Sequence, residues 1–192
     1  MSKKKEMRTV DITNLSTRDG VGNESVVIEG YAAVFNSPTM IGDYFEEVIM
    51  PGAFAKAITS NNDVRALFNH DWNHVLGRTK SGTLRLYEDE RGLKFEVDLP
   101  NSSFAKDFAE SLDRGDIDQC SFGFYPTGEE WDYAAEPAKR KLHDLELFEV
   151  SVVSIPAYED TEVSLVRSKQ IDKAVEERIK LIKQIEGVWK ND

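Results

Sequence analysis

The sequence predicts a mainly β protein with helices packed on the strands, in the α+β class. Short apolar runs, many of them alternating with polar residues, recur along most of the chain, separated by Gly, Pro, Asn and Asp. Only a few stretches repeat apolar residues at helical spacing. We therefore expect a closed or nearly closed β-barrel with two or three helices packed on it.

Strands are expected throughout the body of the chain. Alternating or continuous apolar runs predict them at residues 7–15, 26–35, 44–49, 64–68, 84–87, 93–99, 116–126, 142–154 and 162–166. Gly92 suits the turn of a hairpin between the strands at 84–87 and 93–99. Residues 127–140 are polar and predict a loop or a ragged hairpin.

Helical spacing occurs in separate places along the chain. A short helix is expected over residues 51–58. Residues 101–114 repeat Phe and Leu at helical spacing, with Asn101 or Ser102 as the N-terminal cap. Residues 169–189 carry an apolar stripe between charged residues, which is typical of an amphipathic helix.

The length of 192 residues fits one main domain. Residues 1–24 form an N-terminal segment with one strand, residues 25–167 the main body, and residues 168–192 the amphipathic C-terminal helix. The basic N-terminus is followed by no apolar core, no apolar run reaches the length of a membrane span, and a single cysteine excludes an internal disulfide. We expect an intracellular protein that does not bind a membrane.

The net charge of −11 lies in the body, because both ends carry a small excess of Lys and Arg. An acidic body argues against nucleic-acid binding, which needs a basic face. It is compatible with a basic protein partner, although acidity mostly promotes solubility.

Ser121 lies in the middle of the apolar strand 116–126, two residues before Gly123. A serine among aromatic residues is desolvated, and its hydroxyl needs a partner. Gly123 allows close backbone approach, or lets a backbone N–H support a bound oxyanion. A buried structural serine is the simpler interpretation, and Cys120 is an alternative nucleophile. Because strand side chains alternate, only one of the two faces a site, and Cys120 is expected in the core.

Three histidines, His70, His74 and His143, are candidate bases. His70 follows a strand, so its ring can face a cleft and act as a base for a serine. Ordinary roles are favoured for His74 and His143. Glu149 lies in an apolar run, where its charge is costly unless paired, and we expect an imidazolium as its partner. The alternative for Glu149 is a solvent-facing position, which would apply equally to Glu146.

The sequence predicts neither a metal nor a cofactor. His70 and His74 are four residues apart, as in zinc-binding helices, but they follow a strand and no third ligand has a recognisable spacing. No Gly-rich loop followed by a helix and Lys is present to bind phosphate.

Several short motifs follow one another in the order of a known family. They are residues 29–35, residues 47–54, Asn69-His70-Asp71 with residues 76–79, residues 114–124, and residues 147–153 with residues 156–158. Each motif alone is weak, but the ordered set extends over roughly residues 25–167. With these motifs the chain resembles the prohead (procapsid) maturation proteases of tailed bacteriophages, distant relatives of the herpesvirus assemblins.

The resemblance implies an assemblin-like barrel and a serine endopeptidase inside the immature capsid, in the host cytoplasm. Such an enzyme would cut scaffold segments from the major capsid protein, and then itself. The matching positions imply His70, Ser121 and Glu149 as catalytic residues. Assemblins use a second histidine as the third residue, which keeps His143 open as the alternative to Glu149. They also dimerise, so a homodimer is expected by analogy.

The C-terminal helix has no place in the catalytic body, so we expect it to bind scaffold or to be removed by self-cleavage. The main alternative function is a non-catalytic capsid-assembly or scaffold-binding protein on the same fold. The presence of all three candidate residues favours the enzyme. A general β-barrel binding protein would require the ordered motifs to arise by chance.

Overall fold

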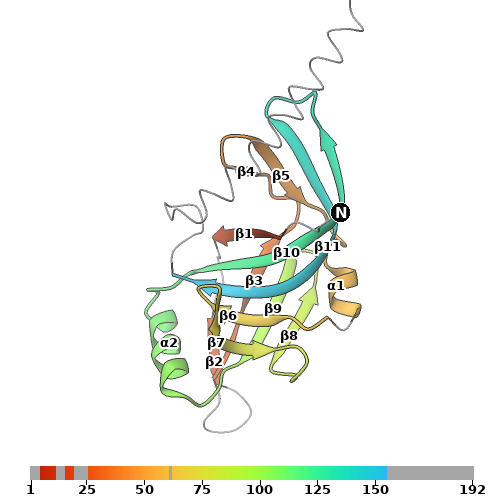
Figure 1. Ribbon diagram of the computed structural model, residues 1–192. Coiled ribbons are helices and arrows are strands. Elements are labelled where there is room, and N and C mark those ends of the chain that lie inside the picture. Colours follow the sequence, from red (N-terminus) through yellow and green to blue (C-terminus); the bar gives the residue numbers. More distant parts are fainter. Residues whose placement is uncertain (1–4, 12–15, 20–25, 61, 155–192) are drawn as a thin grey trace, which may run out of the picture.

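The computed structural model describes residues 5–11, 16–19, 26–60 and 62–154, which form two β-sheets and two helices (Figure 1). The larger sheet contains β1 (Glu6–Asp11), β4 (Thr39–Ile41), β5 (Phe45–Ile49), β6 (Arg65–Phe68), β7 (Asp71–Arg78), β10 (Gln119–Asp132) and β11 (Ala138–Val153). The smaller sheet contains β2 (Ser16–Asp19), β3 (Val26–Val34), β8 (Leu84–Glu88) and β9 (Gly92–Asp98). The expected strand at 162–166 and the C-terminal helix lie outside the described residues.

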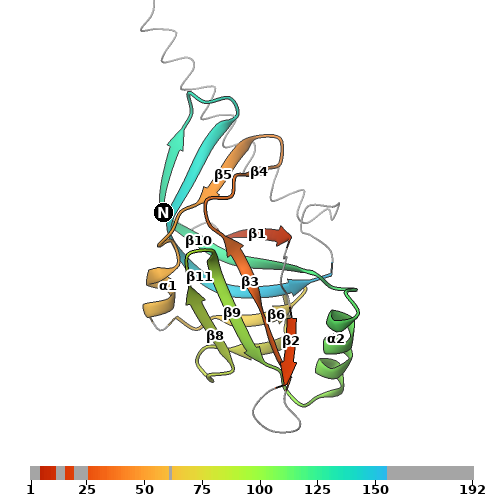
Figure 2. The same ribbon diagram turned by 180° about the vertical axis from the view of Figure 1, so that it is seen from behind.

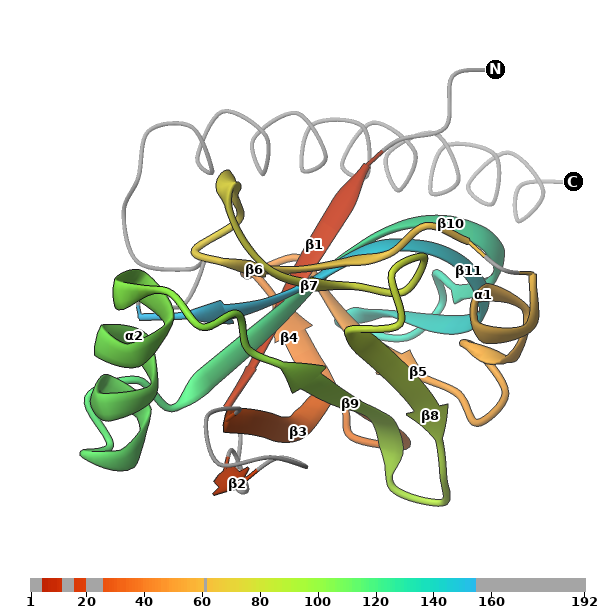
Figure 3. The ribbon, with the colours of Figure 1, turned by 90° about the horizontal axis from the view of Figure 1, so that it is seen from below.

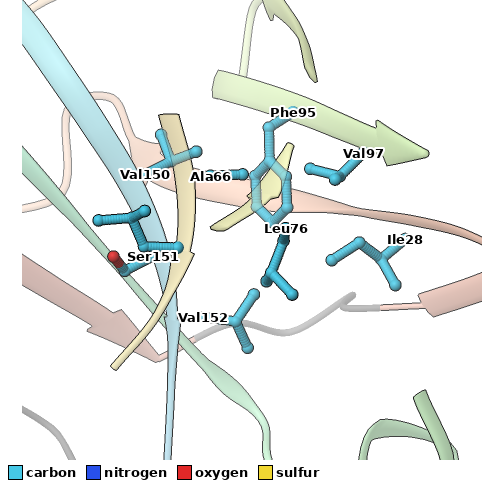
Figure 4. A pocket seen from close by; sticks show the side chains of 9 residues that line it. Ile28, Ala66, Leu76, Phe95, Val97, Val150, Ser151 and Val152 are labelled. Carbon is cyan, nitrogen blue, oxygen red and sulfur yellow. The ribbon is translucent and has the colours of Figure 1, made fainter. Parts of the chain in front are cut away.

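The two sheets pack face to face around one hydrophobic core (Figures 2 and 3). Ile28 and Phe95 of the smaller sheet and Phe122, Val150 and Val152 of the larger sheet are buried in it. A small apolar space between the sheets leaves no room for a water molecule (Figure 4). The interior is therefore packed core, and the polar candidate residues must act from another face.

The expected closed or nearly closed barrel is wrong for the described part of the chain. The larger sheet runs in the order β1-β10-β11-β5-β4, and β6 pairs with both β11 and β7. β10 occupies one edge of β11, whereas β5 and β6 pair with residues 138–142 and 149–152 along the other edge. The sheet therefore forks along this long strand instead of closing on itself.

The polar stretch at residues 127–140 is a hairpin, which was one of the two expected forms. β10 continues to Asp132 and β11 begins at Ala138, so each is far longer than its apolar run. The far halves of both strands, with β4 and β5, extend beyond the sandwich (Figures 1 and 2). Strands β2, β4 and β7 were not predicted, and the polar residues of β2 had been expected to begin a turn at 16–24.

The two helices lie at opposite ends of the sandwich (Figure 3). Helix α1 (Ala55–Thr59) is shorter than the expected helix over 51–58. Helix α2 (Ser103–Asp113) begins as predicted after Ser102, whose Oγ accepts a hydrogen bond from the Ala105 N–H at 3.2 Å. Phe108 of α2 is buried and packs edge-on against Phe68 at the end of β6. No helix among the described residues is long and apolar enough to cross a membrane.

Candidate active site

The turn between β6 and β7 carries His70. Phe68 pairs with Asp71, and the two residues between them, Asn69 and His70, have φ values of 50° and 58°. Two positive φ values in a two-residue hairpin loop are the geometry of a type I′ turn. Asn tolerates this conformation, but for His70 it is strained, and such strain often marks functional positions.

Asn69 attaches this turn to the end of β11. Its N–H donates to the Val152 carbonyl at 2.9 Å, and its side-chain Oδ1 accepts from the Ser154 N–H at 2.9 Å. Its Nδ2 donates to Ser154 Oγ at 3.1 Å. The turn is thereby held on β11, close to the strand positions that carry the candidate carboxylate.

Glu149 of β11 contacts His70, as the sequence predicted. Glu149 Oε1 lies 2.9 Å from His70 Nδ1, and Oε2 accepts a hydrogen bond from Ser151 Oγ at 3.2 Å. Glu149 is fully buried. Because a carboxylate only accepts hydrogen bonds, Nδ1 carries the proton and Nε2 of a neutral ring is left as a base.

Ser121 lies on the same face of the larger sheet as Glu149. In the β10–β11 register Ser121 is opposite Ser151, and Gly123 is opposite Glu149, so the side chains of Ser121, Ser151 and Glu149 share a face with the Gly123 position. Alternation places Cys120 on the other face, in the core. Burial raises the pKa of the Cys120 thiol well above its ordinary value, which disfavours the thiolate that a nucleophile needs.

The hydroxyl of Ser121 points to β1 instead of His70. Ser121 Oγ donates to the Arg8 carbonyl at 2.8 Å. His70 Nε2 is buried and has no hydrogen-bond partner in the described part of the chain. The structure thus joins His70 to Glu149 and places Ser121 on their face, while the Ser121–His70 hydrogen bond is not made. Such bonds are often absent from serine hydrolases without substrate.

The other two histidines have surface positions. His74 is exposed, and its Nδ1 lies 2.7 Å from an oxygen of Asp71. His143 is exposed on the long hairpin, where its partner is Glu130 at 3.4 Å. Neither His74 nor His143 contacts Glu149. Among the residues with described structure, no group of three or more His, Cys, Asp or Glu side chains is arranged to hold a metal.

Gly123 allows two side chains to approach β10 closely. A Cβ atom at this position would lie 2.4 Å from the ring of Phe148 and 2.8 Å from Cγ of Glu149. The missing side chain therefore leaves room for the carboxylate that meets His70. A role of its backbone at an oxyanion stays a prediction.

Gly123→Ala is expected to destabilise the fold by about 1–3 kcal/mol, because Phe148 and Glu149 must both shift. Urea unfolding measures the change. The control is a double-mutant cycle with Phe148→Leu, which removes the obstructing ring atoms. An equal cost in both backgrounds would show that the ring is not the obstacle.

A buried cluster of charges ties β1 to β5 and β11, and the sequence did not reveal it. It consists of Glu6 and Arg8 on β1, Glu47 on β5 and Arg140 on β11. Burial alone would raise the pKa of Glu6, but the charges and hydrogen bonds of Arg8 and Arg140 lower it below its ordinary value. Glu6 is therefore held ionised, and β1 is fastened beside Ser121.

The family assignment follows from comparison with known proteins. Residues 13–177 match the family model described as caudovirus prohead serine protease. The chain belongs to this prohead protease family. It is 34% identical over 146 residues to the prohead protease of Enterobacteria phage HK97, and this match covers 74% of this chain and 60% of the phage HK97 protein. It is 32% identical over 154 residues to the prohead protease of Escherichia phage T5, covering 78% and 68%.

A solved structure supports the fold of this prohead protease family member. The bacteriophage T4 capsid assembly protease superposes with a TM-score of 0.55 at 10% sequence identity. The superposition covers 80% of this chain and 99% of that one. At this identity the likeness concerns the fold alone.

Two residues that support the site were missed from the sequence. Ser151 donates to Glu149, and Asn69 holds the His70 turn. Ser151 was within reach of sequence reasoning, because it follows Glu149 by two residues and so shares its strand face. Asn69 before His70 was a signal for a tight turn with positive φ.

Proposed function

We propose that this chain is a serine endopeptidase that cleaves segments of the major capsid protein or its scaffold during procapsid maturation, and also its own chain. One observation carries the proposal: Glu149 holds His70 by Nδ1 and leaves a buried Nε2 without a partner, on the sheet face of Ser121. Family membership supports the same reaction class.

In the proposed mechanism Ser121 Oγ attacks the carbonyl carbon of a peptide bond. Its proton passes to His70 Nε2, and the buried carboxylate of Glu149 stabilises the imidazolium that forms. The C–N bond then breaks, and His70 returns the proton to the leaving amine. Water then attacks the acyl-serine while His70 takes its proton, the bond between the acyl carbon and Ser121 Oγ breaks, and His70 returns the proton to Oγ. Before the first step, the hydroxyl hydrogen must leave the Arg8 carbonyl for His70.

The partners follow from the same proposal. The enzyme acts on capsid protein and scaffold inside the immature capsid in the host cytoplasm, and it works as a homodimer. Residues beyond about Arg167 bind scaffold or capsid protein and are candidates for self-cleavage. Residues 168–192 lie outside the described structure, so their sequence pattern alone supports this part.

The test is co-expression of the full chain with the major capsid protein of its own phage, followed by mass spectrometry of both proteins. We expect capsid protein shortened at defined positions. Intact capsid protein that co-purifies with the chain would instead support the non-catalytic assembly protein. Capsid protein that is neither cut nor bound would contradict both functions.

A further inference from the structure

Strand β1 lies beside Ser121 and presents a backbone carbonyl to it. It pairs antiparallel with β10, with Arg8 opposite Phe122 and Thr9 opposite Ser121. The carbonyl of Arg8 accepts the Ser121 hydroxyl at 2.8 Å. The other edge of β10 is filled by β11 along the same residues. An extended peptide that pairs with β10 beside Ser121 therefore takes the place of β1.

The side chains of β1 that face away from Ser121 belong to the buried cluster of charges. Alternation puts Glu6 and Arg8 on the face opposite to Thr9 and Ser121, so the hydroxyl approaches the Arg8 carbonyl from the side without the long side chain. Both side chains are only 8% exposed. Their partners are Glu47 of β5 and Arg140 of β11.

The cluster contains two bidentate ion pairs, each joining a residue of β1 to a residue of the main body. Arg8 Nε and an Arg8 terminal nitrogen donate to the two oxygens of Glu47 at 2.6 and 2.9 Å. Arg140 donates through both terminal nitrogens to Glu6, at 2.7 and 3.2 Å. The ring of Phe124 lies 5.4 Å from the guanidinium carbon of Arg8. Planar arginine suits this forked pairing and the aromatic contact better than lysine.

The positions of Glu47 and Arg140 in the cluster are set by the pairing of β5 with β11, in which the two residues are opposite each other. Glu47 and Arg140 are 3% and 4% exposed, contact each other at 3.0 Å, and come from strands of the main body. A strand with Glu, any residue, then Arg satisfies both groups. The reversed order places like charges together. An uncharged strand buries Glu47 and Arg140 without the hydrogen bonds that Arg8 and Glu6 give them, which is unfavourable.

We propose that Glu47 and Arg140 set the sequence preference of the protease. The preferred substrate strand carries arginine at the residue whose carbonyl Ser121 attacks and glutamate two residues before it. This inference rests on the proposed peptidase function and deepens it by naming the recognised residues. The alternative is that the cluster only fastens β1 to the body.

The test uses the full chain and a complex peptide mixture prepared with a protease that leaves arginine and glutamate intact. Mass spectrometry identifies every new cleavage position. The Ser121→Ala variant is the inactive control, which reports cleavage by contaminating proteases. We expect the residue before the cut bond to be arginine most often and lysine second most often. Glutamate should be enriched two residues before that position. In Glu47→Gln the preference for arginine should fall at least about tenfold.

Glu46→Gln is the matched control, because Glu46 is the adjacent residue of β5 and pairs instead with Lys139 at 3.2 Å. It should keep the arginine preference. If the cluster is only structural, cleavage should show no preference for a basic residue before the cut bond. That result would overturn this inference and leave the proposed peptidase function standing. Absence of any cleavage, of peptides and of capsid protein, would overturn both. If Glu47→Gln does not fold, the wild-type cleavage profile decides by itself.

Discussion

Ser121→Ala is expected to reduce the rate of capsid-protein cleavage by roughly 10⁶-fold, to the background level. In the proposed mechanism the substitution removes the oxygen that forms the covalent bond with substrate. It also removes one buried hydrogen bond to the Arg8 carbonyl, worth about 1 kcal/mol, so the fold should survive. Cleavage is measured by quantitative mass spectrometry, and folding by circular dichroism during urea unfolding.

Cys120→Ala is the control for this prediction. The thiol lies on the core face of the same strand, so this variant should cleave capsid protein at nearly the wild-type rate. If activity is retained in Ser121→Ala and lost in Cys120→Ala, the nucleophile is the Cys120 thiol and not Ser121. Loss in both, with a normal fold, would mean that the strand itself is too sensitive to assign either residue the role of nucleophile.

His70→Asn is expected to lower cleavage by a similar factor, roughly 10⁶-fold, because base and nucleophile act as a unit. Asn is chosen because it tolerates the positive φ of 58° at this position, whereas Ala would add backbone strain. Removal of the orienting carboxylate in Glu149→Gln should cost less, roughly 10⁴-fold. Single-turnover cleavage of capsid protein measures all these losses.

His74→Ala and His143→Ala are the matched histidine controls. Both side chains are exposed and paired with surface carboxylates, so neither variant should lose more than a few-fold in activity. Equal losses in His70→Asn and His143→Ala would point to a Ser-His-His arrangement, in which Glu149 is not the third member.

Local pattern predicted most of the elements. Alternation placed β3, β5, β6, β8 and β9 close to their observed bounds, and the spacing of Phe104 and Phe108 with the Ser102 cap predicted α2. These features depend on residues near one another in the chain, which is why sequence alone reveals them. The candidate residues were found from the ordered family motifs together with the unusual settings of His70, Ser121 and Glu149.

Pairing between strands distant in the chain was beyond the reach of the sequence. Residues 138–142 and 149–152 of β11 bind different partners along one edge, and no local pattern says whether such a sheet forks or closes. The barrel expectation failed for this reason. The pairing of β1 with β10 likewise joins residues more than a hundred positions apart.

The sequence by itself determined the prohead protease family, the acidic and mainly β body, and the three polar residues suited to serine peptidase chemistry. Tertiary structure decided their geometry. The tight turn at Asn69 directs His70 to Glu149, and the register of β10 and β11 puts Ser121 on their face. The paired charges of Glu6, Arg8, Glu47 and Arg140 hold β1 beside Ser121. The physical reason is that hydrogen bonds and buried ion pairs form between distant segments, and their partners exist only once the chain has folded.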